Sequence, residues 1–291
     1  MTDKLKTNPM LPYLGKLVEV KDIATEIKLF RVEMLNGGGE AFRDYRPGQF
    51  AFVSAFGVGE APFGIANIPH FGDQNGDTNG DATLDFAINR LGSVTTDLHE
   101  LGVGDMVGVR GPMGNGFPMD KFKGKDLIVI GGGIGGAPLR PVIQTVIANR
   151  AAYGHFQILW AARNPSLLVF TDEYDNWRST PDTELHLTVD QADNTWNHSI
   201  GLITQLLERV APSPENSVTI TCGPPIMIHF VNRVLVEKLG FMPEQNYVTL
   251  EARMHCGIGK CGRCNLGTKL ICVDGPVFTM AEVGALLESF L

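Results

Sequence analysis

Short apolar or alternating runs fill the first third of the chain, and turns rich in Gly, Pro, Asn and Asp separate them. No helical periodicity lies between these runs. A series of short runs with turn residues between them is typical of antiparallel β structure. The pattern predicts a six-stranded antiparallel β-barrel with strands at residues 17–23, 27–34, 49–55, 63–68, 83–89 and 105–110.

A polar insertion at residues 69–81 interrupts this pattern. Its alternating Asp and Asn residues, at positions 73, 75, 77 and 79, are spaced as in a calcium-binding loop. Such a loop also needs a closing Glu and a Gly at a fixed offset, and both are missing here. The insertion is therefore predicted to be a solvated hairpin tip.

The pattern changes near residue 126. A buried strand at 126–130 runs into a glycine-rich turn, and residues 139–150 then carry apolar side chains at helical spacing. Strands and helices alternate from there on, and this alternation predicts a doubly wound α/β domain with about five parallel strands. The further strands are expected at 156–161, 185–189 and 217–221, and the further helices at 172–177, 202–210 and 225–239.

The glycine-rich turn fits the pattern of a phosphate-binding loop. Gly131, Gly133 and Gly136 match G-x-G-x-x-G between a strand and a helix, where backbone N–H groups bind phosphates. Pro138 and Pro141 are expected in the first helical turn, where N–H groups have no partner.

Ligands of such domains bind beyond the carboxyl ends of the strands. Arg163 follows the second strand, and Cys222 to Pro224 follow a later one, so both are expected to face the crevice at the glycine turn. No Asp or Glu follows the second strand as in a strict NAD fingerprint, which leaves NAD and NADP both open. Asp190 contacts the nucleotide or caps a loop, and the cap is favoured.

Four cysteines near the C-terminus are spaced C-x4-C-x2-C, followed by seven residues and the last cysteine: Cys256, Cys261, Cys264 and Cys272. The opening spacing is that of plant-type [2Fe-2S] ferredoxins. The glycines at 257, 259 and 262 allow the positive φ angles of a tight loop around a cluster. Zinc is the alternative, but structural zinc sites usually have two C-x2-C pairs and this segment has one.

The charged and histidine side chains in and beside the loop are not expected to be ligands. His255 is expected on the surface or behind the ligands, since four cysteines complete the site. Lys260 and Arg263 attract an acidic partner or balance the charge of the cluster, and the sequence does not separate these roles.

Composition narrows the classes of protein. A length of 291 residues predicts more than one domain, and a net charge of -8 argues against a nucleic-acid groove. No run approaches the ~18 apolar residues of a membrane helix, and the N-terminus does not read as a signal peptide. With four cysteines in a cluster, Cys222 has no partner for a disulfide, which predicts a reducing compartment, the cytoplasm.

Several motifs carry a family resemblance. A barrel followed by a nucleotide domain, with GSVT at 92–95, GPMGNGF at 111–117 and CGPP at 222–225, resembles the ferredoxin-NADP reductase superfamily. TLEARM at 249–254 and CVDGPVF at 272–278 are similar to the gamma subunit of soluble sulfhydrogenases and to the corresponding subunit of anaerobic sulfite reductases. The resemblance runs from about residue 9 to the C-terminus, nearly the whole chain.

The resemblance implies three domains: an FAD-binding β-barrel at 10–120, an NAD(P)-binding α/β domain at 121–245 and a [2Fe-2S] domain at 246–291. The superfamily's Arg-x-Tyr-Ser flavin motif aligns with residues 61–67, where Phe63 packs on the flavin or is an ordinary core aromatic. Ala61 and Gly64 lack the Arg charge and Ser hydroxyl that hold the flavin phosphates. Backbone amides and Thr95 or Thr96 are expected to hold them instead.

The resemblance also assigns individual residues. Cys222 is expected at the nicotinamide, with a small buried residue beside a turn as the equal alternative. The four cysteines of the loop are the expected metal ligands. The expected cofactor-binding residues are Phe63, Gly64, Ile65, Asn67, Gly92, Val94, Thr95, Thr96, Gly111, Gly131, Gly133, Ile134, Gly135, Arg163, Gly223 and Pro224.

The implied activity is electron transfer between NAD(P)H, FAD and a [2Fe-2S] cluster. Flavin connects the two ends because nicotinamide carries two electrons and the cluster carries one. The chain lacks a second cysteine cluster, so a partner subunit with further clusters is expected to hold the terminal substrate, a [NiFe] hydrogenase first. The alternatives are a sulfite reductase, a dihydroorotate dehydrogenase, a ferredoxin-dependent transhydrogenase, or an assembly subunit that has lost flavin.

Overall fold

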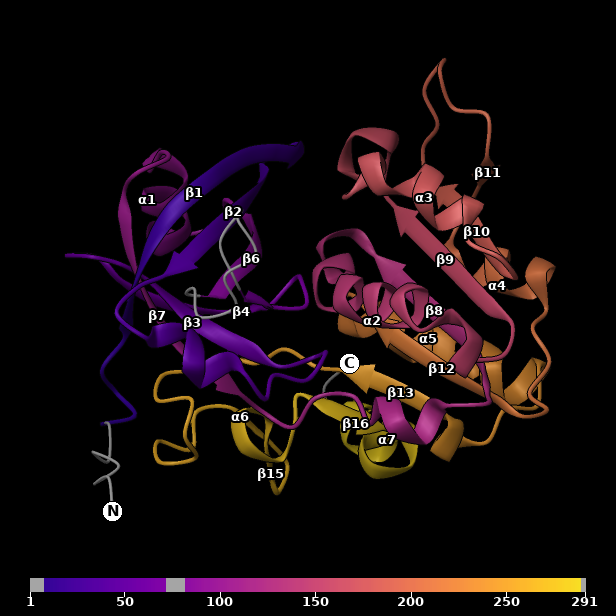
Figure 1. Ribbon diagram of the computed structural model, residues 1–291. Coiled ribbons are helices and arrows are strands. Elements are labelled where there is room, and N and C mark those ends of the chain that lie inside the picture. Colours follow the sequence, from indigo (N-terminus) through magenta and orange to yellow (C-terminus); the bar gives the residue numbers. More distant parts are fainter. Residues whose placement is uncertain (1–7, 72–81, 289–291) are drawn as a thin grey trace.

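A curved antiparallel sheet forms the N-terminal half of the computed structural model, which describes residues 8–71 and 82–288 (Figure 1). Its strand order is β4-β3-β7-β1-β2-β6-β5, and every pair of neighbours is antiparallel. The predicted antiparallel barrel is thus confirmed, with seven strands in place of the six expected. Its strands are β1 (Tyr13–Ala24), β2 (Ile27–Met34), β3 (Phe50–Ala55), β4 (Gly59–Gly64), β5 (His70–Phe71), β6 (Ala82–Asn89) and β7 (Met106–Met113).

Two details of the barrel differ from the prediction. The strand expected at 63–68 is β4, because a tight turn after Ala55 sends the chain straight back along β3. A short helix, α1 (Ser93–Glu100), was not predicted, and it begins where the hydroxyl of Thr95 accepts hydrogen bonds from the N–H groups of Leu91 and Gly92. The insertion expected as a hairpin tip lies mostly outside the described residues, at 72–81.

A second sheet, mostly parallel, forms the nucleotide half, in the order β11-β10-β9-β8-β12-β13-β16. All its pairs are parallel except β13 with β16. Its strands are β8 (Asp126–Gly132), β9 (Phe156–Ala162), β10 (Thr183–Val189), β11 (Ser199–Ile200), β12 (Ser217–Cys222), β13 (Asn246–Thr249) and β16 (Val277–Thr279).

Helices cover both faces of this sheet. Side chains of a strand alternate between its faces. Val129 packs in one core with α2 (Gly136–Ala148) and α3 (Tyr174–Ser179), whereas Ile128 and Ile130 pack in another with α4 (Ile203–Val210) and α5 (Pro225–Arg233). The domain is therefore doubly wound, as predicted.

Helix α2 differs from its predicted form in the place of one proline. It begins at Gly136, so Pro138 lies in its first turn, as expected, but Pro141 lies inside the helix. A proline there has no N–H for the hydrogen bond to the preceding turn. The helix continues to Ala148 in spite of this, and the predicted helix at 225–239 is α5 followed by a π-helical turn, Val234–Lys238.

The C-terminal segment is built into both halves. After β13 it forms the cysteine loop, β14 (Asn265–Leu266), β15 (Lys269–Leu270) and α6 (Ile271–Asp274), then returns as β16 and ends in α7 (Met280–Glu288). Its core includes Cys264 and Cys272 together with Phe50 and Phe52 of the barrel. The expected boundary at 245/246 falls just before β13, which continues the nucleotide sheet.

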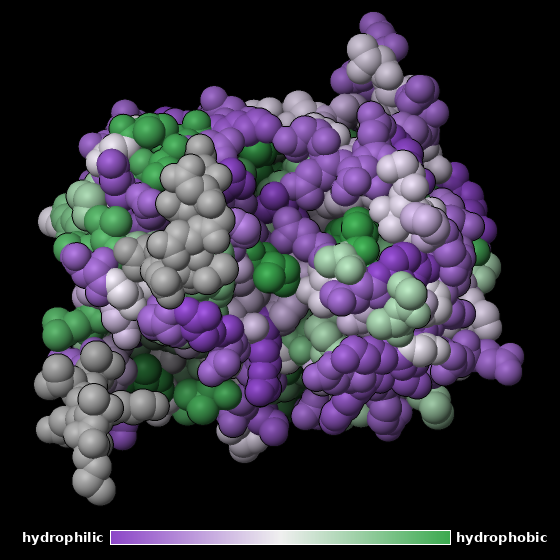
Figure 2. Space-filling view, in the orientation of Figure 1, coloured by the Kyte–Doolittle hydropathy of each residue, from purple (hydrophilic) through white to green (hydrophobic). Residues whose placement is uncertain are grey.

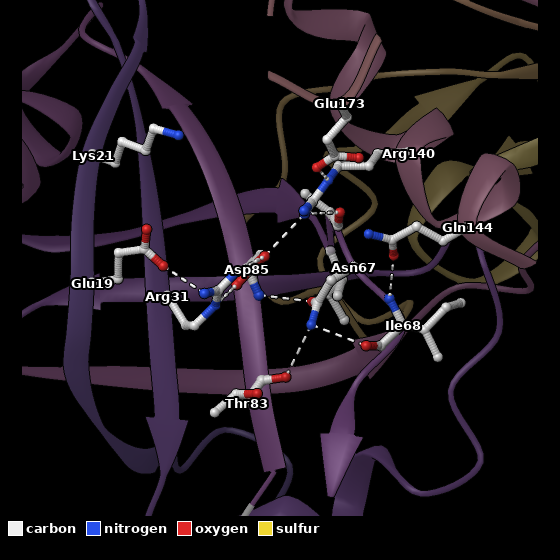
Figure 3. A network of polar contacts seen from close by, with 12 residues as sticks. Glu19, Lys21, Arg31, Asn67, Ile68, Thr83, Asp85, Arg140, Gln144 and Glu173 are labelled. Carbon is white, nitrogen blue, oxygen red and sulfur yellow. Dashed lines mark hydrogen bonds and ion pairs between the residues drawn. The ribbon is translucent and has the colours of Figure 1, made fainter. Parts of the chain in front are cut away.

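A buried ion network joins the two halves (Figure 3). Asp85 of β6, with 1% of its side chain exposed, accepts two hydrogen bonds from Arg31 and one, at 2.9 Å, from Arg140 of α2. Arg140 also donates to the carbonyl of Ala66 at 2.8 Å and to Glu173 at 2.6 Å. Burial raises the pKa of Glu173 in spite of Arg140. The network therefore fixes how the barrel faces the nucleotide domain.

Among the helices that the structure describes, none has the length and apolar character needed to cross a membrane.

Candidate functional site

A cleft of about 1290 Å³ opens at the carboxyl ends of β8, β9 and β12. Its walls come from the glycine turn, from Ala161 to Arg163, from the turn after Cys222 and from the barrel residues Asn89 and Leu91. Figure 2 shows the nucleotide half as mainly hydrophilic, with hydrophobic residues at the hollow between the halves and on the barrel. The cleft lies where doubly wound domains bind nucleotides.

Some glycines of the turn allow close packing and others line the cleft. Gly133 has a positive φ of 57°, and a Cβ there would meet no atom within 4 Å. Gly135 lets the turn approach the end of β12, because its Cβ would lie 2.7 Å from the carbonyl oxygen of Cys222. A Cβ on Gly131 or Gly136 would collide with Trp160. The first and last glycines of the motif therefore serve packing, and residues 133–135 line the cleft.

A smaller cavity of about 240 Å³ lies where the three parts of the chain meet. Pro62, Phe63 and Gly64 of β4 line it from the barrel, Ile134 and Pro138 from the nucleotide domain. It shares Asn89, Leu91, Ile134 and Glu251 with the large cleft, so the two spaces adjoin. An apolar slot of this kind, beside the nucleotide cleft, fits the flat ring of a flavin.

The position of Gly64 explains one departure from the superfamily's flavin motif. A Cβ on Gly64 would lie 2.9 Å from Cγ of Pro138 on helix α2. A serine there would press against the first turn of the nucleotide domain. The missing hydroxyl is thus matched by a close packing contact between the two halves.

Cys222 ends β12 at the wall of the small cavity and is 2% exposed. Burial, aided by the charge of Glu251, raises the pKa of its thiol well above the usual value. At neutral pH the group is therefore a neutral thiol, a weak hydrogen-bond donor rather than a nucleophile.

Most of the expected ligand-binding residues come together, and some do not. The hydroxyl of Thr95 already bonds to its own helix start, and the side-chain amide of Asn67 bonds to backbone groups of Ile68, Thr83 and Asp85 inside the barrel. Of the expected residues, those that line one or both cavities are Phe63, Gly64, Thr95, Gly133, Ile134, Gly135, Arg163, Cys222, Gly223 and Pro224. The expected residues outside both linings are Ile65, Asn67, Gly92, Val94, Thr96, Gly111 and Gly131.

Sequence reasoning missed Glu251, which lines both cavities. Glu251 is exposed at the cleft, and the protein around its carboxyl still removes enough water to raise its pKa. Glu251 follows β13, which no pattern marked as a strand of the nucleotide sheet. The rule that functional groups follow parallel strands would have found it once β13 was recognised. Asp190, at the end of β10, also lines the large cleft.

The cysteine loop presents its thiols in two pairs. Cys256, Cys264 and Cys272 are buried and Cys261 is exposed. Hydrogen bonds between thiols link Cys256 with Cys261 and Cys264 with Cys272, and the charge of Cys256 also acts on Cys272 across the two pairs. In the part of the chain that the structure describes, no three His, Cys, Asp or Glu side chains are grouped to hold a single metal ion. Two pairs of thiols fit the two irons of a [2Fe-2S] cluster better than one zinc ion.

Backbone N–H groups of the loop point at the sulfur atoms. Those of Lys260 and Cys261 donate to Sγ of Cys256, each at 3.3 Å, and that of Gly259 donates to Sγ of Cys272. Backbone hydrogen bonds, that of Ile258 first, lower the pKa of Cys256 to about 6, whereas burial raises that of Cys272 to about 11. The glycines at 257, 259 and 262 all have positive φ, as expected. Donors to sulfur are typical of iron-sulfur sites.

Two family models match the chain. Residues 129–233 match the oxidoreductase NAD-binding domain. Residues 251–284 match the iron-sulfur cluster binding domain of dihydroorotate dehydrogenase B. The two matches fall on the cleft and on the cysteine loop.

Three relatives are similar over nearly their full lengths. Sulfhydrogenase 2 subunit gamma of Pyrococcus furiosus is 35% identical, over 94% of this chain and 96% of the relative. Sulfhydrogenase 1 subunit gamma of the same organism is 36% identical, over 95% and 93%. A probable dihydroorotate dehydrogenase B (NAD(+)) electron transfer subunit of Methanocaldococcus jannaschii is 32% identical, over 92% and 89%.

Solved structures share the fold. A chain of the NADH-dependent reduced ferredoxin-NADP oxidoreductase superposes with a TM-score of 0.72 at 23% identity, over 94% of this chain and 91% of that one. The cytochrome b5 reductase domain of Ulva prolifera nitrate reductase superposes with a TM-score of 0.65 at 22% identity, over 83% and 98%. At these identities the likeness concerns the fold alone.

Proposed function

This chain belongs to the family of electron-transfer subunits that includes the sulfhydrogenase gamma subunits and the electron transfer subunits of dihydroorotate dehydrogenase B, and we propose that it passes electrons between NAD(P)H and a partner protein through FAD and a [2Fe-2S] cluster. The contiguity of the three sites carries this proposal. The large cleft adjoins the small cavity, and residues 250–252 and Met254 line that cavity just before the loop begins at Cys256.

The residues of each site have separate roles in this proposal. The backbone at Gly133 and Gly135, with the turn at Pro224, holds the nucleotide phosphates at the start of α2. The neutral thiol of Cys222 orients the nicotinamide beside the small cavity. Flavin accepts a hydride and releases single electrons when it is bound there. Phe63 provides an apolar wall of its site, and the four cysteines of the loop hold the cluster.

For the partner we propose a [NiFe] hydrogenase. Supporting this, the two sulfhydrogenase gamma subunits are 35% and 36% identical to the chain, against 32% for the electron transfer protein of dihydroorotate dehydrogenase B. A dihydroorotate dehydrogenase is the second candidate, because the cysteine segment matches the iron-sulfur domain of that enzyme. Affinity purification of the chain from its own cells separates the two through the metal content of the partner, nickel for the first and none for the second.

We also propose that the chain works in the cytoplasm. All five cysteines are free, and four of them are committed to the loop. Reduced thiols of this kind persist in a reducing compartment. Fractionation of cells followed by immunoblotting tests the location, and recovery in an oxidising compartment would contradict it.

An anaerobic titration of the purified chain with NADH and then NADPH tests the electron path, with flavin, iron and sulfide quantified beforehand. We expect the flavin absorbance to bleach first and a rhombic [2Fe-2S] EPR signal to follow. The nucleotide that reduces faster identifies the preference that the sequence leaves open. A chain that holds iron but no flavin, and that only dithionite reduces, would refute the path and support an assembly role.

A further inference from the structure

Arg110 of β7 is buried beneath the cysteine loop, and the proposed electron path gives it no role. Its side chain is 2% exposed. Nη1 donates to the carbonyl oxygen of Cys256 at 2.8 Å and more weakly to that of Pro9 at 3.4 Å. A cation from the barrel therefore holds the backbone of the first cysteine of the loop.

The other donors of the guanidinium are occupied by Glu60 of β4. Nη2 donates to Glu60 Oε1 at 2.6 Å and Nε to Oε2 at 3.2 Å. The guanidinium also lies 4.3 Å from the ring centre of Phe52. These contacts fix the plane of the guanidinium and its direction toward the loop.

The loop rests on the barrel at the next residue as well. A Cβ on Gly257 would lie 2.6 Å from Cε2 of Phe52 and 2.5 Å from Sδ of Met113. Because strands β3 and β7 carry these side chains, the position of the loop depends on the barrel as well as on its own glycines. Arg110 is the charged residue of this contact surface between the barrel and the loop.

The charges of Arg110 and Glu60 affect the reduction potential of a cluster that the loop holds. Reduction adds one negative charge to the cluster, and a buried cation stabilises added negative charge more strongly than an exposed one. Glu60, whose side chain is 27% exposed, acts in the opposite direction. Hydrogen bonds and charges near the sulfur atoms are known means of setting cluster potentials.

We propose that Arg110 and Glu60 are positioning residues that set the reduction potential of the cluster, Arg110 raising it and Glu60 lowering it. The inference rests on the proposed function only in that the loop holds the cluster. Two residues of the barrel, and not only those of the loop, would then determine the potential at which electrons leave the cluster.

An EPR-monitored redox titration with dithionite and mediators tests the pair in the purified chain. Arg110→Met keeps an apolar stem against Phe52 and removes the charge, so the midpoint should fall. Glu60→Gln keeps the size and removes the opposing charge, so the midpoint should rise. We expect each variant to change the ratio of reduced to oxidised cluster at a fixed potential by about tenfold, which is about 59 mV for one electron.

The midpoint shifts of the two variants are expected to have opposite signs. This separates an electrostatic effect from a loss of packing between barrel and loop, because lost packing would shift both midpoints in the same direction. Arg31→Met removes another barrel arginine, paired with Asp85 and Glu19, and should leave the midpoint unchanged. Shifts of the same sign, or a Glu60→Gln midpoint equal to that of the unaltered chain, would overturn the inference even if Arg110→Met fails to fold. An unaltered chain without iron would overturn the cluster assignment itself, a distinct result.

Discussion

Replacing Arg140 with Met tests the buried network that joins the two halves. The change keeps much of the side-chain volume but removes the hydrogen bonds to Asp85, Glu173 and the carbonyl of Ala66. Removing one partner of a buried ion pair costs about 3–5 kcal/mol, because a buried charge is left without a partner. Asp85 keeps both hydrogen bonds from Arg31, so we expect the lower end, about 3 kcal/mol.

Another ion pair crosses the same interface and provides the matched control. Lys21 of β1 lies 2.7 Å from Asp172, and the two side chains are 46% and 58% exposed. Exposed pairs contribute about 0–1 kcal/mol, since water screens them. Lys21→Met should therefore cost less than about 1 kcal/mol, although it also removes a charge between the halves.

Thermal unfolding of the two variants, followed by fluorescence under anaerobic conditions, measures the difference. About 2 °C per kcal/mol is expected for a chain of this size, which gives a fall of about 6 °C for Arg140→Met and at most about 2 °C for Lys21→Met. Equal shifts would refute the reasoning, because they would mean that burial does not distinguish the two pairs. A double variant with Asp85→Asn should lose less than the sum of the single losses, since the two residues contact each other.

The remaining predictions concern the glycine turn, the carboxylate between the cavities and the cysteine loop. Gly133→Leu should raise the KM for NAD(P)H at least tenfold in steady-state assays with unchanged flavin content, whereas Gly124→Leu, also at positive φ with no atom within 4 Å of its Cβ but outside the cleft, should not. The raised pKa of Glu251 means that the folded state binds this proton more tightly, so stability should fall as pH rises through the usual value of 4.5 to the raised one. Glu251→Gln should flatten that part of a plot of urea midpoint against pH, and an unchanged slope would contradict the assignment. Cys261→Ser, at the exposed cysteine, should abolish the EPR signal while NADH or NADPH still bleaches the flavin, and loss of both would mean that the loop supports the whole chain.

Local patterns predicted the elements that depend on near neighbours. The alternation at 27–34 matches β2 at both ends, and the strand, glycine turn and helix from 126 onward match β8 and α2 closely. The relatives confirm the electron-transfer role and the two cofactor-binding domains that the motifs implied. The assignment of the four cysteines as ligands stays a prediction that the pairing of their thiols supports.

What the sequence could not predict depends on contacts between distant segments. Asp85 and Arg140 are 55 residues apart, and no motif marks either of them. Gly135 is expected from the sequence as a cofactor-binding residue, and nothing in the sequence marks its close approach to the carbonyl oxygen of Cys222. The hydrogen bond from Arg110 to the carbonyl of Cys256 joins residues 146 positions apart in the sequence, and only the fold brings them together.

The pairing of β13 with β16 makes the iron-sulfur segment an insertion within a sheet rather than a tail. Cutting the chain after residue 245 would remove two strands from the nucleotide sheet and expose the edge of β12. An exposed edge strand can pair with another chain and aggregate. Excising only the stretch between Thr249 and Val277, and joining the two strands by a short turn, would leave every ladder of the sheet intact. Exchange of this segment between relatives, by evolution or by protein engineers, should therefore succeed at those two strand ends and fail at the apparent domain boundary.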